Sequence, residues 1–125
     1  MEDDMSKHGE FSHIEFPADD LERAKAFYGS VFGWQFRDME GYDNYGLYTA
    51  GPGDLGGGIG VRGQSAGNVV RNYITVDSVD DTLAAVTANG GAIVTPKTDI
   101  GIGWYAAVTD PEGNELGLYK SKNPG

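Results

Sequence analysis

The chain repeats one pattern of predicted secondary structure twice, and this repetition limits its possible folds more than any other feature. Each copy begins with a strand, continues with an amphipathic helix and ends with three further strands. The two copies begin HIEFPADDLERA and YITVDSVDDTLA, and after one gap Ile14 aligns with Ile74. His13 in turn aligns with Tyr73. We therefore predict an α+β fold made of two tandem βαβββ modules.

The two modules are expected over residues of about 10–62 and 69–121, in a single domain that spans residues 10–121. Residues 1–9 are expected to be a flexible N-terminal tail, and residues 122–125 a C-terminal tail. Asp19 or Asp20 can cap the first helix and Ser78 the second, and glycines follow both helices. The elements are expected at residues 10–17 (strand), 21–32 (helix), 34–39, 45–50 and 58–62 (strands), then 70–77 (strand), 78–89 (helix with its cap), 92–95, 102–109 and 115–120 (strands). The glycines at residues 56–58 are interpreted as a bend between strands.

Alternation along the first strand of each module separates two faces of the expected sheet. Ile14 and Phe16 lie on the apolar face of the first module, and Ile74 and Val76 on that of the second. These faces are expected to pack against the helices, the first of which presents the apolar stripe Leu21, Ala24, Phe27, Tyr28, Val31 and Phe32. The opposite faces carry an amphipathic mixture, namely Phe11, His13, Glu15, Arg71, Tyr73 and Thr75. Such a concave face favours a small-molecule pocket; a second subunit packed on it is the alternative.

The net charge of −10, from nine basic and nineteen acidic residues, excludes several classes of function. An acidic surface repels phosphate backbones and anionic lipids, so we expect no nucleic-acid or membrane partner. No apolar run approaches the roughly 18 residues of a spanning helix, and the acidic N-terminus is unlike a signal peptide. The chain has no cysteine, which excludes disulfides, thiolate zinc sites and cysteine nucleophiles. A cytoplasmic protein is the expectation.

Three segments carry a resemblance to a known family. HIEFPADDLERAKAFYGSVFGW, YITVDSVDDTLAAVTANGGAIVTP and WYAAVTDPEGNELGLY together resemble the vicinal oxygen chelate superfamily, the group of glyoxalases, bleomycin-resistance proteins and extradiol dioxygenases. The resemblance covers the chain from about Phe11 to Tyr119. It implies two βαβββ modules in a cup-shaped mixed sheet with helices on the outer face, and often a homodimer. Metal-dependent members of the group hold a divalent ion in the cup.

The resemblance also implies where metal ligands should stand, and few of those positions match. His13 corresponds to the histidine of the first strand. The second ligand position corresponds to Tyr73, and the carboxylate expected on the last strand corresponds to Gly117. Glu115 could serve only in a shifted register. A metal centre needs three or four converging N or O ligands, so we predict that the metal site is incomplete and no cofactor is needed. If a divalent metal binds, His13 and Glu115 are the candidate ligands.

His13 and Glu15 are the candidate catalytic residues, because they share a strand face at a spacing of about 7 Å. A nearby carboxylate would raise the pKa of the imidazole and orient the ring. A former ligand that now bonds to Glu15 or Tyr73 is the alternative for His13. The candidate ligand-binding residues supply aromatic walls, a hydroxyl and a cation for a carboxylate or phosphate: Tyr73, Tyr105, Trp104, Tyr48, Thr75 and Arg71. Aromatic residues in strands are also common in cores.

Three functions remain open. The leading hypothesis is a glyoxalase-like protein that binds a small molecule in the cup without a complete metal site. The first alternative is a divalent-metal-dependent lyase or isomerase of the glyoxalase I type, which would act on a small carbonyl compound. The second is a binder that sequesters a drug or antibiotic without changing it. The sequence leaves open whether the protein is an enzyme.

Overall fold

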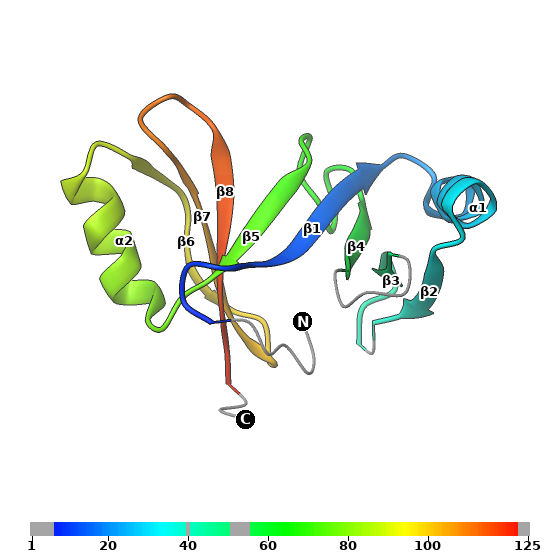
Figure 1. Ribbon diagram of the computed structural model, residues 1–125, viewed down its shortest axis with the longest axis horizontal. Helices are drawn as coiled ribbons and strands as arrows, with labels where there is room; N and C mark the ends of the chain where they lie inside the picture. Colours follow the sequence, from blue (N-terminus) through cyan, green and yellow to red (C-terminus); the bar gives the residue numbers. More distant parts are fainter. Residues whose placement is uncertain (1–6, 40, 51–55, 123–125) are drawn as a thin grey trace. The chain divides into compact units, whose positions relative to one another are not determined.

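The computed structural model describes residues 7–39, 41–50 and 56–122 (Figure 1). Its two helices and eight strands follow the predicted order, so the α+β class and the two βαβββ modules are confirmed. The first module contains β1 (Phe11–Ala18), α1 (Leu21–Phe32), β2 (Gln35–Asp38), β3 (Tyr45–Thr49) and β4 (Gly56–Val61). The second contains β5 (Arg71–Thr75), α2 (Val79–Ala88), β6 (Ala92–Asp99), β7 (Gly103–Thr109) and β8 (Glu115–Ser121).

The chain divides into two compact units, whose boundary falls inside β1. One unit spans His13–Val70, and the other combines Met1–Ser12 with Arg71–Gly125. The N-terminal segment thus groups with the second module. Gly9 N donates to Thr75 O at 2.8 Å and Thr75 N donates to Glu10 O at 2.9 Å. Part of the expected N-terminal tail is therefore hydrogen-bonded to β5, while residues 1–6 and 123–125 lie outside the described residues.

In the unit His13–Val70, the strand order is β2-β3-β4-β1, with β1 and β4 parallel and the other pairs antiparallel. The side chain of Asp20 accepts a hydrogen bond from Arg23 N at the start of α1, and Gly33, with φ 74°, ends the helix. Helix α1 covers one face of these strands. The core on that face consists of Ala18, Tyr48 and Ile59, with Phe16, Leu21, Ala24, Tyr28, Trp34, Phe36 and Ala50 packed against it.

Only part of the predicted apolar stripe of α1 faces this core. Tyr28 packs into it, whereas Phe27, Val31 and Phe32 remain 55%, 56% and 58% exposed. The prediction that the whole stripe packs on the strands was wrong, because six apolar positions span more of the helix surface than one sheet face can cover. These three residues form an exposed apolar patch on α1.

In the other unit, the strand order is β5-β8-β7-β6, with β5 and β8 parallel and the remaining pairs antiparallel. Ser78 caps α2 by accepting a hydrogen bond from Asp81 N, as predicted. The core beneath α2 consists of Val76, Val79, Ala106, Val108 and Leu118, with Ile74, Leu83, Val86, Trp104 and Leu116 packed against it. The predicted apolar face of the second module is confirmed. Within the described residues, neither helix is long and apolar enough to cross a membrane.

Two strands extend two or more residues beyond their predicted bounds. Strand β4 already begins at Gly56, so the glycines at residues 56–58 form strand rather than a bend. A Cβ at Gly57 would collide with the backbone of Ile14, so the close approach of β4 to β1 requires glycine there. Strand β6 continues past Pro96 to Asp99, with two register shifts against β7. Pro96 is tolerated because β6 is an edge strand in this unit.

Candidate functional site

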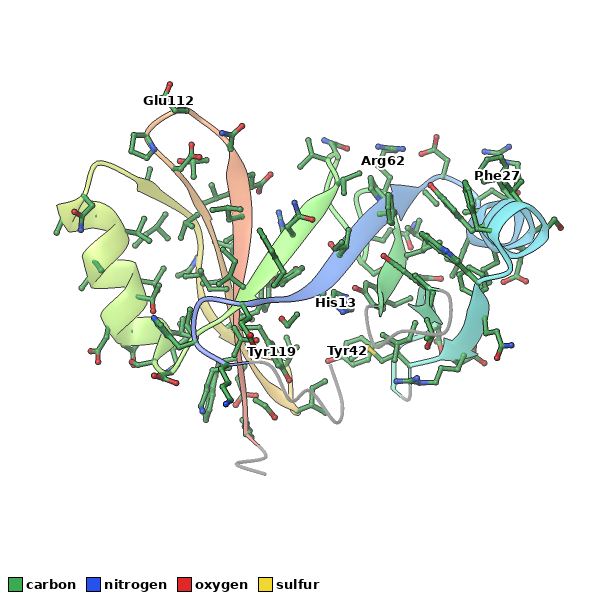
Figure 2. The ribbon with its side chains drawn as sticks, viewed as in Figure 1. His13, Phe27, Tyr42, Arg62, Glu112 and Tyr119 are labelled. Atoms are coloured by element: carbon green, nitrogen blue, oxygen red, sulfur yellow. The ribbon has the colours of Figure 1, made fainter. Side chains whose placement is uncertain are left out.

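Three polar side chains meet on the face of the unit His13–Val70 that lies opposite α1. His13 extends from β1 (Figure 2). Glu15 extends from the same strand, and the two residues are 1% and 5% exposed. Tyr45, from β3, stands between them and is 7% exposed. Its hydroxyl lies 2.7 Å from His13 Nε2 and 2.7 Å from Glu15 Oε2. The structure thus links the two predicted catalytic residues through the Tyr45 hydroxyl. These three residues form the His13–Tyr45–Glu15 cluster.

The hydrogen-bond directions in the cluster follow from its proton count. The Tyr45 hydroxyl has one proton, which it donates to Glu15 Oε2. Its oxygen must then accept the second hydrogen bond from His13 Nε2–H. These directions place a proton on Nε2 of the imidazole.

Burial governs the titration of His13. It lowers the pKa of the imidazole from 6.5 to about 3, because the charged form loses its hydration. The sequence-based expectation was a raised pKa, from a nearby carboxylate. That expectation was wrong: desolvation of the buried ring has the largest effect on the pKa, and Glu15 Oε2 accepts its hydrogen bond from Tyr45. His13 is neutral at pH 7.

Gly58 makes room for Tyr45. Strand β4 pairs Gly58 with Glu15 of β1 and with Leu47 of β3, so Gly58 shares the face of the cluster. A Cβ at residue 58 would collide with the ring and hydroxyl of Tyr45. The His13 and Tyr45 rings lie nearly parallel, with centroids 6.2 Å apart and an interplanar angle of 11°. The missing side chain of Gly58 therefore allows the ring to lie flat against β4.

Sequence reasoning missed Tyr45. It stands 30 residues from Glu15 and 32 from His13, and the alternation of a short strand does not reveal which strand lies beside it. The available signal was weak: Tyr45 begins a predicted strand and shares its alternation with Leu47, on the face opposite Tyr48. Only the pairing of both β3 and β1 with β4 identifies the contact.

The second unit also has a face opposite its helix. Tyr73 of β5 pairs with Gly117 of β8, and a Cβ at Gly117 would collide with the Tyr73 ring. Tyr105 of β7 lies beside Tyr73, with ring centroids 6.5 Å apart at 61°. Thr75 follows Tyr73 on the same face of β5. Two of the predicted aromatic residues are therefore neighbours, and each unit contains a tyrosine ring over a glycine.

Arg71 lies on the same face and forms an ion pair with Glu115. Its Nη2 donates to Glu115 Oε1 at 2.7 Å, and the two side chains are 14% and 24% exposed. Burial alone would lower the pKa of Arg71, but hydrogen bonds and charge interactions with Tyr73 and Glu115 raise it above its usual value. Arg71 stays charged, and Glu115 compensates that charge.

Two other predicted ligand-binding residues do not lie on these faces. Tyr48 packs in the core beneath α1, where it stacks on Trp34 with centroids 4.3 Å apart and donates to Ile14 O. Trp104 packs against the core beneath α2, with Lys97 and Lys122 over its ring. As strand neighbours, Trp104 and Tyr105 point to opposite faces. Tyr48 and Trp104 therefore pack with the cores beneath the helices and do not stand with Tyr73 and Tyr105.

The side chains that the structure describes do not suit a divalent metal ion. Among the described residues, no group of three or more His, Cys, Asp or Glu side chains is placed to hold one. His13 Nε2 is bonded to Tyr45, and Glu115 is paired with Arg71. Gly117 provides no carboxylate. The two conditional metal ligands thus have other partners in the structure.

Comparisons with known proteins agree with this fold. The family model of the Glyoxalase/Bleomycin resistance protein/Dioxygenase superfamily matches residues 10–118. A glyoxylase-like domain-containing protein of Didymella fabae is 34% identical over 119 residues, which are 88% of this chain and 92% of that protein. CFP32 of Mycobacterium bovis, which carries a provisional glyoxylase name, is 30% identical over 122 residues. The match covers 92% of this chain and 47% of CFP32, so the chain spans about half the length of that relative.

A solved structure extends the comparison to the backbone. The crystal structure of methylmalonyl-CoA epimerase from Mycobacterium tuberculosis matches with a TM-score of 0.70 and 13% sequence identity. The match covers 95% of this chain and 93% of the epimerase. At this identity the likeness concerns the fold alone.

Proposed function

Because this chain belongs to the Glyoxalase/Bleomycin resistance protein/Dioxygenase superfamily, we propose that it is a glyoxalase-like protein that binds a small organic molecule without a complete metal site. The observation that carries this proposal is the buried His13–Tyr45–Glu15 cluster. Burying a carboxyl and an imidazole costs free energy, and such groups with altered titration are concentrated at functional sites.

The cluster offers proton transfer rather than metal chemistry. A neutral imidazole can exchange a hydrogen bond or a proton with a bound molecule. Tyr45 fixes the ring orientation through the 2.7 Å hydrogen bond to Nε2. We assign His13 and Glu15 to the catalytic role if the bound molecule reacts. The reaction would be that of a lyase or isomerase on a small carbonyl compound, since such reactions move a proton.

The second unit supplies further candidate binding residues. Tyr73 and Tyr105 offer ring surface, and Arg71 and Thr75 offer hydrogen bonds on the same strand face. A binder that sequesters a drug unchanged would use these same groups, so this alternative differs only in the fate of the ligand. The metal-dependent alternative has weaker support, because His13 and Glu115 already bond to Tyr45 and Arg71.

A thermal-shift screen tests the proposal. Purified protein would be heated with metabolites, small carbonyl compounds and drug-like amphiphiles, each with and without EDTA. We expect stabilising compounds whose effect is insensitive to EDTA and smaller in the matched variants His13→Gln and Tyr45→Phe. Mass spectrometry of the recovered ligand then separates turnover from sequestration. A screen without any stabilising compound, or hits that disappear with EDTA, would contradict the proposal.

We further propose a homodimer in the cytoplasm. The exposed apolar patch of α1 (Phe27, Val31 and Phe32) supports self-association, because water contact with these side chains is unfavourable. The absence of cysteine suits a reducing compartment. Sedimentation equilibrium of the wild type and of the Phe27→Glu variant tests the dimer. We expect the mass of two chains for the wild type and of one chain for the variant. A wild-type mass of one chain would contradict the dimer, and a dimeric variant would contradict its formation through this patch.

A further inference from the structure

Arg71 has a buried donor that the described residues leave unsatisfied. Its Nη2 donates to Glu115 Oε1, but its Nε is shielded from solvent and has no hydrogen-bond partner among the described residues. A buried N–H without an acceptor is unfavourable, and few remain in folded proteins without a reason. An acceptor oxygen beside Nε would remove this penalty.

The shape of the guanidinium group indicates where that oxygen lies. Nε–H and one N–H of Nη2 point in the same direction, along one edge of the planar group, and form a fork for two acceptor oxygens. Glu115 Oε1 accepts from Nη2 at 2.7 Å, so Nε is the donor of the fork that lacks an acceptor among the described residues. The position beside Nε, next to Glu115, is the one that remains.

Charge decides what kind of oxygen fits there. Glu115 already compensates the charge of Arg71, so a second anion would be repelled by Glu115 about as strongly as Arg71 attracts it. The net charge of −10 adds to the repulsion. An uncharged carbonyl oxygen accepts the same hydrogen bond without this repulsion and with a smaller desolvation cost. The sequence predicted that Arg71 binds a carboxylate or a phosphate. The ion pair with Glu115 favours a neutral acceptor instead.

The neighbouring side chains restrict the rest of the ligand. Tyr73 hydrogen-bonds to Arg71, and Tyr105 presents its partly exposed ring at 61° to that of Tyr73. Tyrosine rings favour flat, apolar partners.

We propose that Arg71, Tyr73 and Tyr105 form a binding site for an uncharged planar carbonyl compound, whose oxygen accepts a hydrogen bond from Arg71 Nε. The site rests on the proposed function, since it names the class of small molecule bound. It assigns Glu115 a second role: by compensating Arg71, Glu115 selects neutral ligands over anionic ones.

The test follows the Arg71 Nε–Hε signal by ¹⁵N NMR while benzamide or benzoate is added. The two compounds match in size and differ in charge. Arg62 is the matched control, because its Nε already donates to Asp19 Oδ1 at 2.9 Å. The Arg71→Lys variant assigns the Arg71 signal by removing it. We expect benzamide to shift the Arg71 signal but not that of Arg62, and benzoate to bind the wild type more weakly.

Glu115→Gln should reverse this selectivity. With the charge of Arg71 uncompensated, benzoate should bind about tenfold more tightly than to the wild type. The proposal is overturned if benzamide leaves the Arg71 signal in place, if Arg62 shifts equally, or if benzoate binds the wild type more tightly than benzamide. Stabilising compounds in the thermal-shift screen together with an unmoved Arg71 signal would overturn this site alone. A screen without hits would contradict the proposed function itself.

Discussion

The ring of Tyr45 lies over Gly58, in the space that a side chain at residue 58 would need. This relationship explains how a large phenol fits between His13 and Glu15 on a strand face. Because Gly58 pairs with Glu15 across the parallel β1–β4 ladder, the glycine and the carboxylate stay in fixed register. The geometry of the cluster therefore depends on the absence of a side chain as much as on the three side chains present.

Gly58→Ala should disrupt the cluster. The added methyl group would collide with Tyr45, so we expect the free energy of unfolding to fall by about 1–3 kcal/mol. Urea unfolding measures this change. Gly29→Ala is the control, because a Cβ in that helical position meets only ordinary contacts, the nearest being Trp34 O at 3.6 Å. The control should be about 0.5–1 kcal/mol more stable than the wild type. Equal stability of Gly58→Ala and the wild type would show that the Tyr45 ring is not confined.

Tyr45→Phe should destabilise the protein without changing its packing. It leaves His13 Nε2 and Glu15 Oε2 without their shared 2.7 Å partner in a buried site, which should cost about 1–3 kcal/mol. Thermal unfolding of the variant provides the measurement. Tyr42→Phe is the matched control, since Tyr42 is 40% exposed, and its replacement should change stability by less than about 0.5 kcal/mol. Similar losses in both variants would remove the special role of the Tyr45 hydroxyl.

Acid should destabilise the protein through His13. Its pKa is about 3 in the folded chain against 6.5 for an unperturbed histidine, so the unfolded chain binds the extra proton first. The contribution of His13 is fully present above about pH 6.5 and is lost as the pH falls towards 3. The slope should approach about 1.4 kcal/mol per pH unit between these limits. Urea midpoints from pH 7 to 4 measure it, and His13→Gln should flatten the slope. An unchanged slope in that variant would assign the acid sensitivity to other groups.

Metal removal should have little effect. His13 and Glu115 are bonded to Tyr45 and Arg71, so we expect metal far below one equivalent in purified protein by elemental analysis. EDTA should leave the melting temperature unchanged within error, and added Mn²⁺ or Zn²⁺ should not raise it. One equivalent of bound metal, lost together with several degrees of stability on EDTA treatment, would contradict this account of the site.

The fold was predictable because its signals are local. The alternation of Ile74 and Val76 predicted the face that packs on α2, and the capping residue Ser78 predicted where α2 begins. The length of β6 was not predictable, since Pro96 usually ends a strand and is tolerated only at an edge. The exposed half of the α1 stripe was missed for a similar reason: periodicity predicts an apolar surface but not how much of it a partner covers.

The candidate site was predictable only in part. His13 and Glu15 share one strand, so their common face followed from a period of two. Tyr45 reaches them across β4, and no local pattern reports such a contact. The pKa of His13 was predicted in the wrong direction because burial, unlike a neighbouring carboxylate, cannot be read from adjacent residues. Sequence spacing thus predicted the common face of His13 and Glu15, and the strand pairing places Tyr45 between them.

The ¹⁵N resonances of the His13 ring, followed by NMR from pH 8 to 4, test the central claim most directly. If the His13–Tyr45–Glu15 cluster holds the imidazole neutral, the ring should keep its proton on Nε2 across this range, with no titration near pH 6.5 and no response to EDTA or Mn²⁺. A ring that titrates near pH 6.5, or one that broadens on stoichiometric binding of Mn²⁺, would contradict the claim.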